Sequence, residues 1–153
     1  MSKYLIVRDT QEKANFWNFE PSEKCIGTTD DSLSTGDYTI KGMEDIFTIE
    51  RKYSTGEFSG NITEARFERQ LCRMDAMKHS FLVLEFTLQD VYNFPSGSGI
   101  PSKKWSQLRV TPNFILKRLI EIETDHKCKI IFAGNKGEEI ATTIFKRMQQ
   151  LYA

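Results

Sequence analysis

Two short segments decide the fold expected of this chain: Gly36-Asp37-Tyr38-Thr39-Ile40 and Ile46-Phe47-Thr48-Ile49-Glu50-Arg51-Lys52. Both are rich in β-branched and aromatic residues, which favour strands, and the stretch Lys41–Asp45 between them has the composition of a turn. We therefore predict two successive strands, Leu33–Ile40 and Ile46–Arg51.

Two carboxylates and a lysine on these strands have the arrangement that a metal-dependent phosphodiesterase needs. Asp37 and Glu50 lie near neighbouring strand ends, where they can converge on one divalent ion, and carboxylate oxygens suit Mg²⁺ or Mn²⁺. Lys52 lies two positions after Glu50, so a strand directs both side chains to one face. Its ammonium can hold the attacking water or stabilise the pentacovalent phosphate, while Arg51 points the other way or offers its backbone carbonyl. The alternative is a hairpin in which Glu50 and Lys52 form a solvated charge pair.

The composition is that of an ordinary globular protein. The chain has 153 residues, of which 39% are hydrophobic and 27% charged, enough for one domain with its own core. No apolar run approaches the roughly 18 residues of a membrane span, and the N-terminal apolar stretch is too short for a signal peptide. Three widely spaced cysteines form no Cys-x-x-Cys pair and fit reduced, structural residues of a cytosolic protein. Because the 21 basic residues equal the 21 acidic ones, any basic surface for nucleic acid must be local.

The hydrophobic pattern predicts alternating strands and helices along the remaining chain. The continuous apolar run Phe81–Phe86 is typical of a central strand covered on both sides. Residues 10–33 look irregular, Gly56 and Gly60 are expected to flank a loop, and the stretch Pro95–Ser102 predicts a mobile loop. The other expected elements are a strand at Lys3–Arg8, a helix at Ile62–His79, a helix from Pro112, a strand at Lys129–Gly134 and a helix at Glu138–Leu151.

This order of elements predicts an α/β fold in a single domain over residues 1–153. A strand, a strand pair, and then alternating helices and strands give a mixed central sheet flanked by helices. Each expected helix has apolar residues at the spacing of one buried face. These residues are Phe67, Leu71 and Met74 in the first helix, Ile115, Leu119 and Ile122 in the second, and Ile140, Ile144, Met148 and Leu151 in the third.

Two groups of basic residues are candidate contacts for DNA. Arg66, Gln70 and Arg73 share one side of the first expected helix, and the alternative is a solvated face softened by Glu64 and Glu68. Lys103, Lys104 and Arg109 surround Trp105, which could stack on an unpaired base; the alternative is a helix start with one anchoring aromatic. His79 and His126 have no acid or cysteine at ligand spacing in the sequence, so we expect both to be incidental.

Four motifs follow one another along the chain: Asp9-Thr10-Gln11-Glu12-Lys13, Gly36-Asp37-Tyr38, Ile49-Glu50-Arg51-Lys52 and Arg66-Phe67-Glu68-Arg69-Gln70. In their order and spacing the chain resembles the XPF-type nuclease domain, a branch of the restriction-endonuclease-like PD-(D/E)xK superfamily. It is most similar to the compact bacterial and phage single-domain members. The resemblance spans nearly the whole chain and implies a restriction-endonuclease-like core.

The resemblance also implies a function and roles for particular residues. It implies a Mg²⁺- or Mn²⁺-dependent DNA endonuclease of DNA repair, recombination or phage DNA processing, in the cytoplasm of a bacterial or phage-infected cell. The products would carry 5′-phosphate and 3′-hydroxyl ends. Asp37 and Glu50 would be the metal ligands, Lys52 the catalytic lysine, Glu12 an auxiliary carboxylate near the metal, and Arg51 a residue important for activity.

The chain departs from the family pattern at two positions. Gln11 replaces the arginine of the first motif, and the family's aspartate after Lys52 falls at Gly56, so Glu57 fills that role only if the loop carries an inserted residue. The tandem helix-hairpin-helix domain of some relatives is not expected, so their selectivity for branched DNA does not carry over. Two alternatives keep the fold: a catalytically silent DNA-binding scaffold, and a nuclease subunit that acts as a homodimer or with a helicase or recombinase partner. Possible substrates include branched, flapped, single-stranded and duplex DNA.

Overall fold

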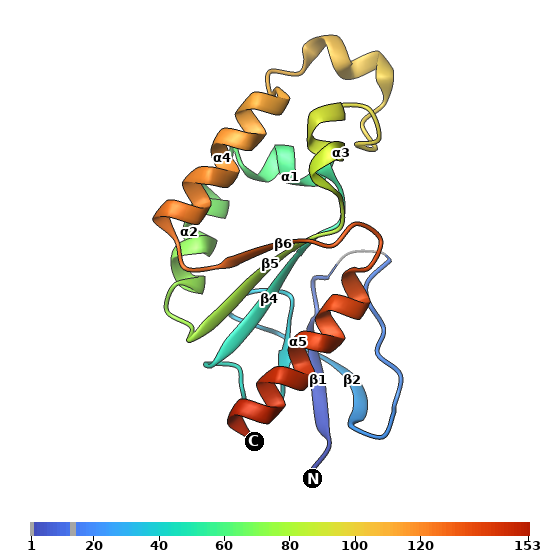
Figure 1. Ribbon diagram of the computed structural model, residues 1–153, viewed down its shortest axis with the longest axis vertical. Coiled ribbons are helices and arrows are strands. Elements are labelled where there is room, and N and C mark those ends of the chain that lie inside the picture. The colour runs from blue at the N-terminus through green and yellow to red at the C-terminus, as the bar shows by residue number, and fades with distance from the viewer. Residues whose placement is uncertain (1, 13–14) are drawn as a thin grey trace.

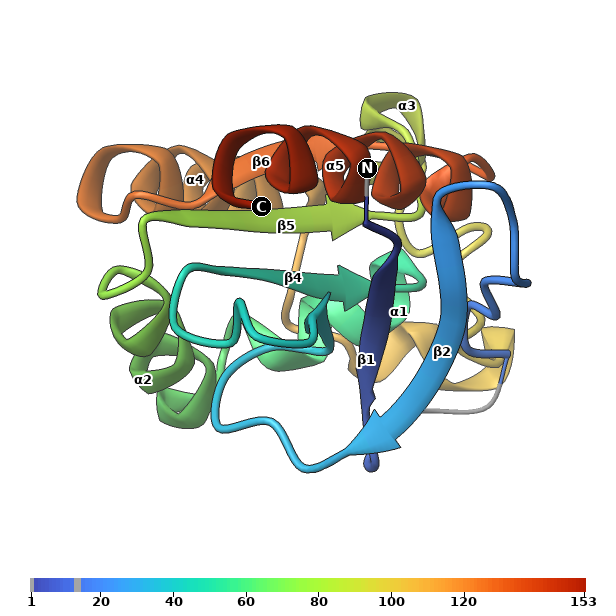
Figure 2. The ribbon, with the colours of Figure 1, turned by 90° about the horizontal axis from the view of Figure 1, so that it is seen from below.

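A computed structural model describes residues 2–12 and 15–153 as a six-stranded mixed sheet with helices on both faces (Figure 1). The strand order is β2-β1-β3-β4-β5-β6, and only β3 runs antiparallel to its two neighbours. The sheet is strongly twisted: in Figure 2, β1 and β2 run across the direction of β4 and β5. The strands are β1 (Tyr4–Asp9), β2 (Cys25–Asp31), β3 (Tyr38–Ile40), β4 (Phe47–Lys52), β5 (His79–Leu84) and β6 (Lys129–Phe132).

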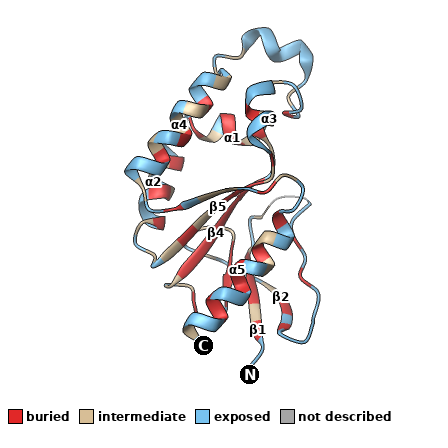
Figure 3. Ribbon diagram, viewed as in Figure 1, coloured by how far each residue is buried: buried red, intermediate tan, exposed pale blue. Residues whose placement is uncertain are grey.

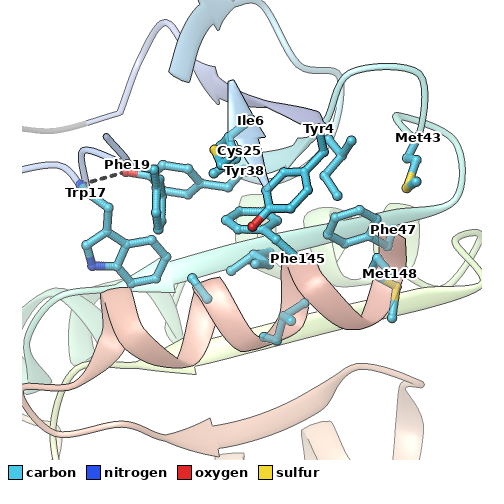
Figure 4. Packing of buried hydrophobic residues seen from close by; sticks show 14 of the residues in the cluster. Tyr4, Ile6, Trp17, Phe19, Cys25, Tyr38, Met43, Phe47, Phe145 and Met148 are labelled. Atoms are coloured by element: carbon cyan, nitrogen blue, oxygen red, sulfur yellow. Dashed lines mark hydrogen bonds between the residues drawn. The ribbon is translucent and has the colours of Figure 1, made fainter. Parts of the chain in front are cut away.

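One face of the sheet is covered by α5 (Gly137–Tyr152) together with the segment around Trp17 (Figure 4). Phe145 of α5 packs on Phe47 of β4 and on Tyr4, with ring centroids about 6 Å apart. The hydroxyl of Tyr38 accepts the backbone N–H of Trp17 at 2.9 Å, which satisfies a polar atom inside this core. Odd-numbered positions of β4 therefore face α5.

The other face is covered by α1 (Thr55–Asn61), α2 (Ala65–Met74), α3 (Leu88–Asn93) and α4 (Pro112–Asp125). The buried residues of this second core include the predicted apolar faces of α2 and α4, and Leu82 and Leu84 of β5. Figure 3 shows burial concentrated on the inner faces of these helices and along β4 and β5. None of the helices that the structure describes is long and apolar enough to cross a membrane.

The prediction of a mixed sheet flanked by helices is confirmed, but several boundaries differ. Residues 10–33 are not irregular throughout, since β2 pairs in parallel with β1 and forms the sheet edge. The alternation of apolar and polar residues in β2 is weak, and the backbone hydrogen bonds that define this strand are made with β1, which is distant in sequence. The expected strand Leu33–Ile40 is reduced to β3, and the expected helix Ile62–His79 is reduced to α2, which ends at Met74.

The loop expected around Gly56 and Gly60 is the helix α1. Ser54 caps it by accepting the backbone N–H of Glu57 at 3.0 Å, and Phe58 is fully buried in the second core. Each glycine costs the helix about 0.5–1 kcal/mol relative to alanine. The burial of Phe58 offsets that cost, which is why local propensity misleads here.

The expected mobile loop Pro95–Ser102 is largely exposed but contacts the rest of the molecule at Ser98. Ser98 is buried, and its carbonyl lies against the α-carbon of Gly56 in α1. The short 3₁₀ helix η1 (Ser102–Gln107) follows, and Trp105 Nε1 donates to the carbonyl of Ile100 at 2.9 Å. At the C-terminus, Leu151 is 44% exposed, so the predicted buried stripe of α5 ends at Met148.

Candidate active site

A cavity of about 280 Å³ opens where β4 ends, between α1, α2 and the loop that precedes β3. It brings together residues from all four sequence motifs. Most of the residues predicted for catalysis and for DNA contact line it: Glu12, Asp37, Glu50, Arg51, Lys52, Arg66, Gln70 and Arg73. Asp9, Gln11, Glu57 and Glu64 line it as well.

Glu50 and Lys52 point to the same face of β4, as the strand periodicity predicts. Lys52 Nζ lies 2.9 Å from Glu50 Oε2, and Gln70 Nε2 of α2 donates to Glu50 Oε1 at 2.7 Å. Glu50 is 4% exposed and Lys52 6%, so the pair is buried and not the solvated charge pair of the alternative reading. Burial opposes the charge of Lys52, but the charge and hydrogen bond of Glu50 outweigh it and raise the pKa of Lys52. Lys52 is therefore an ammonium at neutral pH.

Asp37 is held at the start of β3 by the backbone of β4. Its N–H donates to the carbonyl of Ile49 at 2.8 Å, and its Oδ2 accepts the N–H of Arg51 at 2.7 Å. Gly36 makes this approach possible, because it has a φ of +77° and a Cβ there would lie 1.8 Å from Thr48 Oγ1. Burial, with the charges of Glu50 and Glu12, raises the pKa of Asp37 well above its usual value. Carboxylates that repel one another in a buried cavity are a setting in which a cation is stabilised.

The side chain of Arg51 points to the opposite face of β4 and binds two carboxylates. Its guanidinium pairs with Glu85 Oε1 and lies 3.5 Å from Glu12 Oε2. It also donates to the carbonyl of Asn15 at 2.8 Å and lies 5.1 Å from the ring of Trp17. Arg51 thus ties the segment that carries Glu12 to the strand that carries Glu50.

Glu85 is a charged residue near the site that sequence reasoning missed. It directly follows β5, accepts from Arg51 and from Trp17 Nε1, and lies close to Gly137, where a Cβ would be 2.7 Å from Glu85 Oε2. A single glutamate after an apolar strand carries no local signal for such a partner. Only the packing of β4, β5 and α5 brings these groups together.

One of the two departures from the family motifs, at Gly56, has a structural explanation. A Cβ at Gly56 would lie 2.3 Å from the carbonyl oxygen of Ser98, so an aspartate does not fit at that position. The next residue, Glu57, lines the cavity, accepts the N–H of Tyr53 at 2.9 Å, and contributes to the raised pKa of Lys52. A carboxylate is therefore present one position later. Gln11 is exposed at the cavity rim.

Asp9 has a role in the backbone of the first motif. Its Oδ1 accepts the N–H of Leu33 at 2.9 Å and its Oδ2 the N–H of Gln11 at 3.2 Å. Both hydrogen bonds hold the loops that bring Glu12 and Asp37 to the cavity. Lys13, the last residue of that motif, lies outside the described residues.

The basic residues proposed for DNA fall in different places. Arg66 and Arg73 are exposed at the cavity rim, with Arg66 3.6 Å from Glu64, whereas Gln70 is engaged with Glu50. Lys103 and Lys104 are exposed on η1 and do not line the cavity. The hydrogen bond of Trp105 to Ile100 matches the alternative reading of an anchoring aromatic.

Comparisons with known proteins agree with this architecture. A sequence model of the ERCC4 domain matches residues 9–144. The solved structure of XPF from Aeropyrum pernix superimposes with a TM-score of 0.61 at 15% identity, over 95% of this chain and 61% of that chain. The structure of XPF from Aeropyrum pernix in complex with DNA gives a TM-score of 0.62 at 13% identity, over 97% of this chain and 66% of that chain. No curated protein shows significant sequence similarity. The likeness of the structures establishes the nuclease-domain fold, and the chain spans less than two thirds of either XPF chain.

Proposed function

This chain belongs to the ERCC4 domain family, and from that premise we propose that it is a divalent-metal-dependent DNA endonuclease of DNA repair or recombination. The observation that carries the proposal is the convergence of Asp37, Glu50 and Lys52 in one cavity beside β4. The motifs in which these three residues stand resemble those of the family, and on that resemblance they correspond to its metal ligands and catalytic lysine. A DNA complex is known for the similar XPF from Aeropyrum pernix.

The residues of the cavity fit a hard divalent cation. Asp37 and Glu50 supply carboxylate oxygens, each of which keeps acceptor capacity beyond its hydrogen bonds to protein groups. The raised pKa of Asp37 reflects burial and the negative charges of Glu50 and Glu12. A bound cation would offset the cost that burial and these charges impose on the ionised carboxylate. When bound, Mg²⁺ or Mn²⁺ supplies Lewis-acid activation of water and neutralises negative charge on the phosphate. Glu12 is proposed to be an auxiliary carboxylate.

The side chains of the cavity orient the reaction. Lys52 has three N–H donors and uses one on Glu50, so the others are available for the attacking water and for a phosphate oxygen. Gln70 holds Glu50 in one orientation, and the N–H of Arg51 holds Asp37. The guanidinium of Arg51 fixes the Glu12 segment at the side of the cavity. Positioning of this kind supplies a large part of the rate acceleration that enzymes achieve.

DNA is proposed to approach over the α2 rim of the cavity. Arg66 and Arg73 are exposed there and can neutralise phosphates on either side of the scissile bond. Lys103 and Lys104 are proposed as a separate contact for a longer substrate. Since the net charge of the chain is zero, these local contacts must supply the electrostatic attraction.

The test is cleavage of labelled flap, junction, single-stranded and duplex DNA in Mg²⁺, Mn²⁺ or EDTA. Wild type and Asp45→Asn, which removes an exposed carboxylate outside the cavity, should cut in metal only, whereas Asp37→Asn and Lys52→Met should not. DNA binding without cutting by wild type would favour the silent scaffold, or a subunit that needs a second copy or a helicase partner. If the wild type neither bound nor cut any of these DNAs, the proposal would be overturned.

A further inference from the structure

A second cluster of metal-ligating side chains lies on the side of α2 that faces α4. Glu68, Cys72 and His126 each offer one ligand atom, and these atoms all lie within 4.8 Å of one another. Gln70, in contrast, points from α2 into the catalytic cavity. The two sites therefore use different faces of one helix.

His126, which the sequence suggested to be incidental, lies between two carboxylates in the structure. It is the C-terminal cap residue of α4, and its side chain is 4% exposed. It lies between Glu68 of α2 and Asp75, the C-terminal cap residue of α2. Its Nε2 lies 2.7 Å from Glu68 Oε1, and its Nδ1 lies 2.7 Å from Asp75 Oδ2. Asp75 Oδ1 also accepts the N–H of Lys127 at 2.8 Å. The acids are far from His126 in sequence, so local spacing gave no sign of them.

We propose that Glu68, Cys72 and His126 bind a zinc-class divalent cation, with a water molecule as the fourth ligand. Imidazole and thiolate ligands favour Zn²⁺ or Co²⁺ over the Mg²⁺ and Mn²⁺ that suit Asp37 and Glu50. The site is independent of the catalytic proposal, because it shares no side chain with the catalytic cavity.

The geometry requires only small adjustments. Zn²⁺ ligand atoms at roughly 2.0–2.3 Å from the ion are about 3.3–3.7 Å apart in a tetrahedron. The Nε2 of His126 and Oε1 of Glu68 would separate slightly from 2.7 Å, and Cys72 Sγ would draw in from within 4.8 Å. Glu68 and Cys72 are one helical turn apart and share a face of α2. Cys72 is exposed, so its side chain can rotate toward the ion.

Asp75 completes the site behind the ligands. A histidine that binds zinc through Nε2 commonly donates its Nδ1–H to a carboxylate, which orients the ring and increases its basicity. Asp75 already holds that position at 2.7 Å, and its other oxygen is fixed by the backbone of Lys127. Arg118 pairs with Glu68 Oε2, which leaves Oε1 as the oxygen directed at the ion.

The residues around the cluster supply the negative charge that a divalent ion requires. Glu68 offers a carboxylate and Cys72 a thiolate as ligands, and the carboxylate of Asp75 contacts His126 from the other side of its ring. Zinc ligands bind in their deprotonated forms, so binding of the ion releases protons. Other ionisable groups near His126 are Lys78, His79, Glu121, Glu123, Lys127, Cys128 and Lys129.

The first experiment titrates Co²⁺ into the Asp37→Asn/Glu50→Gln protein, whose catalytic carboxylates are removed. We expect a near-ultraviolet thiolate-to-cobalt charge-transfer band that saturates at one ion per chain and is displaced by Zn²⁺. Cys72→Ser should abolish the band, whereas Cys128→Ala, at a buried cysteine outside the site, should keep it. Absence of the band in the parent protein, or its persistence in Cys72→Ser, would overturn the proposal.

A second measurement separates ligation from folding. Isothermal titration with Zn²⁺ in buffers of different ionisation enthalpy should report proton release that accompanies binding, because zinc ligands bind deprotonated. Asp75→Asn keeps all three ligands and should weaken binding by about 10- to 100-fold. Circular dichroism checks that each variant is folded, so a protein without the site is distinguished from an unfolded one. Equal affinity of parent, Asp75→Asn and Cys72→Ser would mean that the ion binds elsewhere.

Discussion

Gln70 of α2 donates a hydrogen bond of 2.7 Å to Glu50 of β4, the residue proposed as a metal ligand. The sequence places Gln70 among candidate DNA contacts, beside Arg66 and Arg73. Its hydrogen bond indicates a further role, which is to orient the carboxylate proposed as a metal ligand. Hydrogen bonds to charged groups contribute about 1.5–3 kcal/mol, enough to affect the orientation of Glu50.

We expect Gln70→Ala to slow cleavage by about 10- to 100-fold at saturating DNA while leaving DNA affinity nearly unchanged, because the deleted hydrogen bond positions Glu50. Single-turnover cleavage and DNA titration measure the two effects separately. Arg66→Ala is the matched comparison on the same rim and should weaken DNA binding instead. A Gln70→Ala protein that bound DNA weakly but cut at the normal rate would restore the reading of Gln70 as a DNA contact.

The proposed contacts of Arg66 and Arg73 with phosphate should appear in the salt dependence of binding. Removing one such phosphate contact should reduce the slope of log K against log salt by about 0.9 for duplex DNA. We expect this for Arg66→Ala and Arg73→Ala, measured by fluorescence anisotropy over a range of salt. Lys117→Ala serves as the control, because Lys117 lies on α4 outside the cavity. If all three variants had the same slope as wild type, DNA would bind on another face.

Asp37 should make metal-free stability depend on pH. Its pKa is raised in the folded protein, so its contribution is fully present below the usual value of 3.8 and is lost as pH rises through the raised pKa. In EDTA, Asp37→Asn should therefore gain stability relative to wild type as pH increases over that range. Urea unfolding at several pH values measures this gain.

Magnesium should reverse that difference at neutral pH. A cation that binds the folded state raises the melting temperature of wild type and should raise that of Asp37→Asn much less. Asp45→Asn, whose carboxylate is exposed away from the cavity, should behave as wild type. If Mg²⁺ stabilised Asp37→Asn as much as wild type, Asp37 would not be a ligand.

Gly56 and Gly60 lie in the same short helix but should respond oppositely to alanine. A Cβ at Gly56 meets the carbonyl oxygen of Ser98 at 2.3 Å, whereas nothing lies within 4 Å of a Cβ at Gly60. Thermal or urea unfolding should show Gly56→Ala destabilised by about 1–3 kcal/mol and Gly60→Ala stabilised by about 0.5–1 kcal/mol. Gly56→Asp should also be destabilised, and so should not improve cleavage. A stable, more active Gly56→Asp protein would show that Glu57 does not fill the family's acidic position.

Much of the fold could be predicted because it follows from local periodicity. The apolar faces of α2 and α4 and the apolar run of β5 each follow a pattern within one element, and they are buried as expected except for Phe81, which is half-buried. The weak edge strand β2 and the glycine-containing helix α1 could not be predicted in this way. Their stability comes from pairing with β1 and from burial of Phe58, and neither contact is encoded nearby in the chain.

The amino-acid sequence was sufficient to place Glu50 and Lys52 on one face of a strand, because side chains in a strand alternate with a period of two. It was also sufficient to relate Asp37 to them through the family motifs. The hydrogen bond from Gln70 to Glu50, the pairing of Arg51 with Glu85, and the enclosure of His126 by Glu68 and Asp75 required the folded chain. Each joins segments 20 or more residues apart, and such contacts depend on how the helices pack on the sheet.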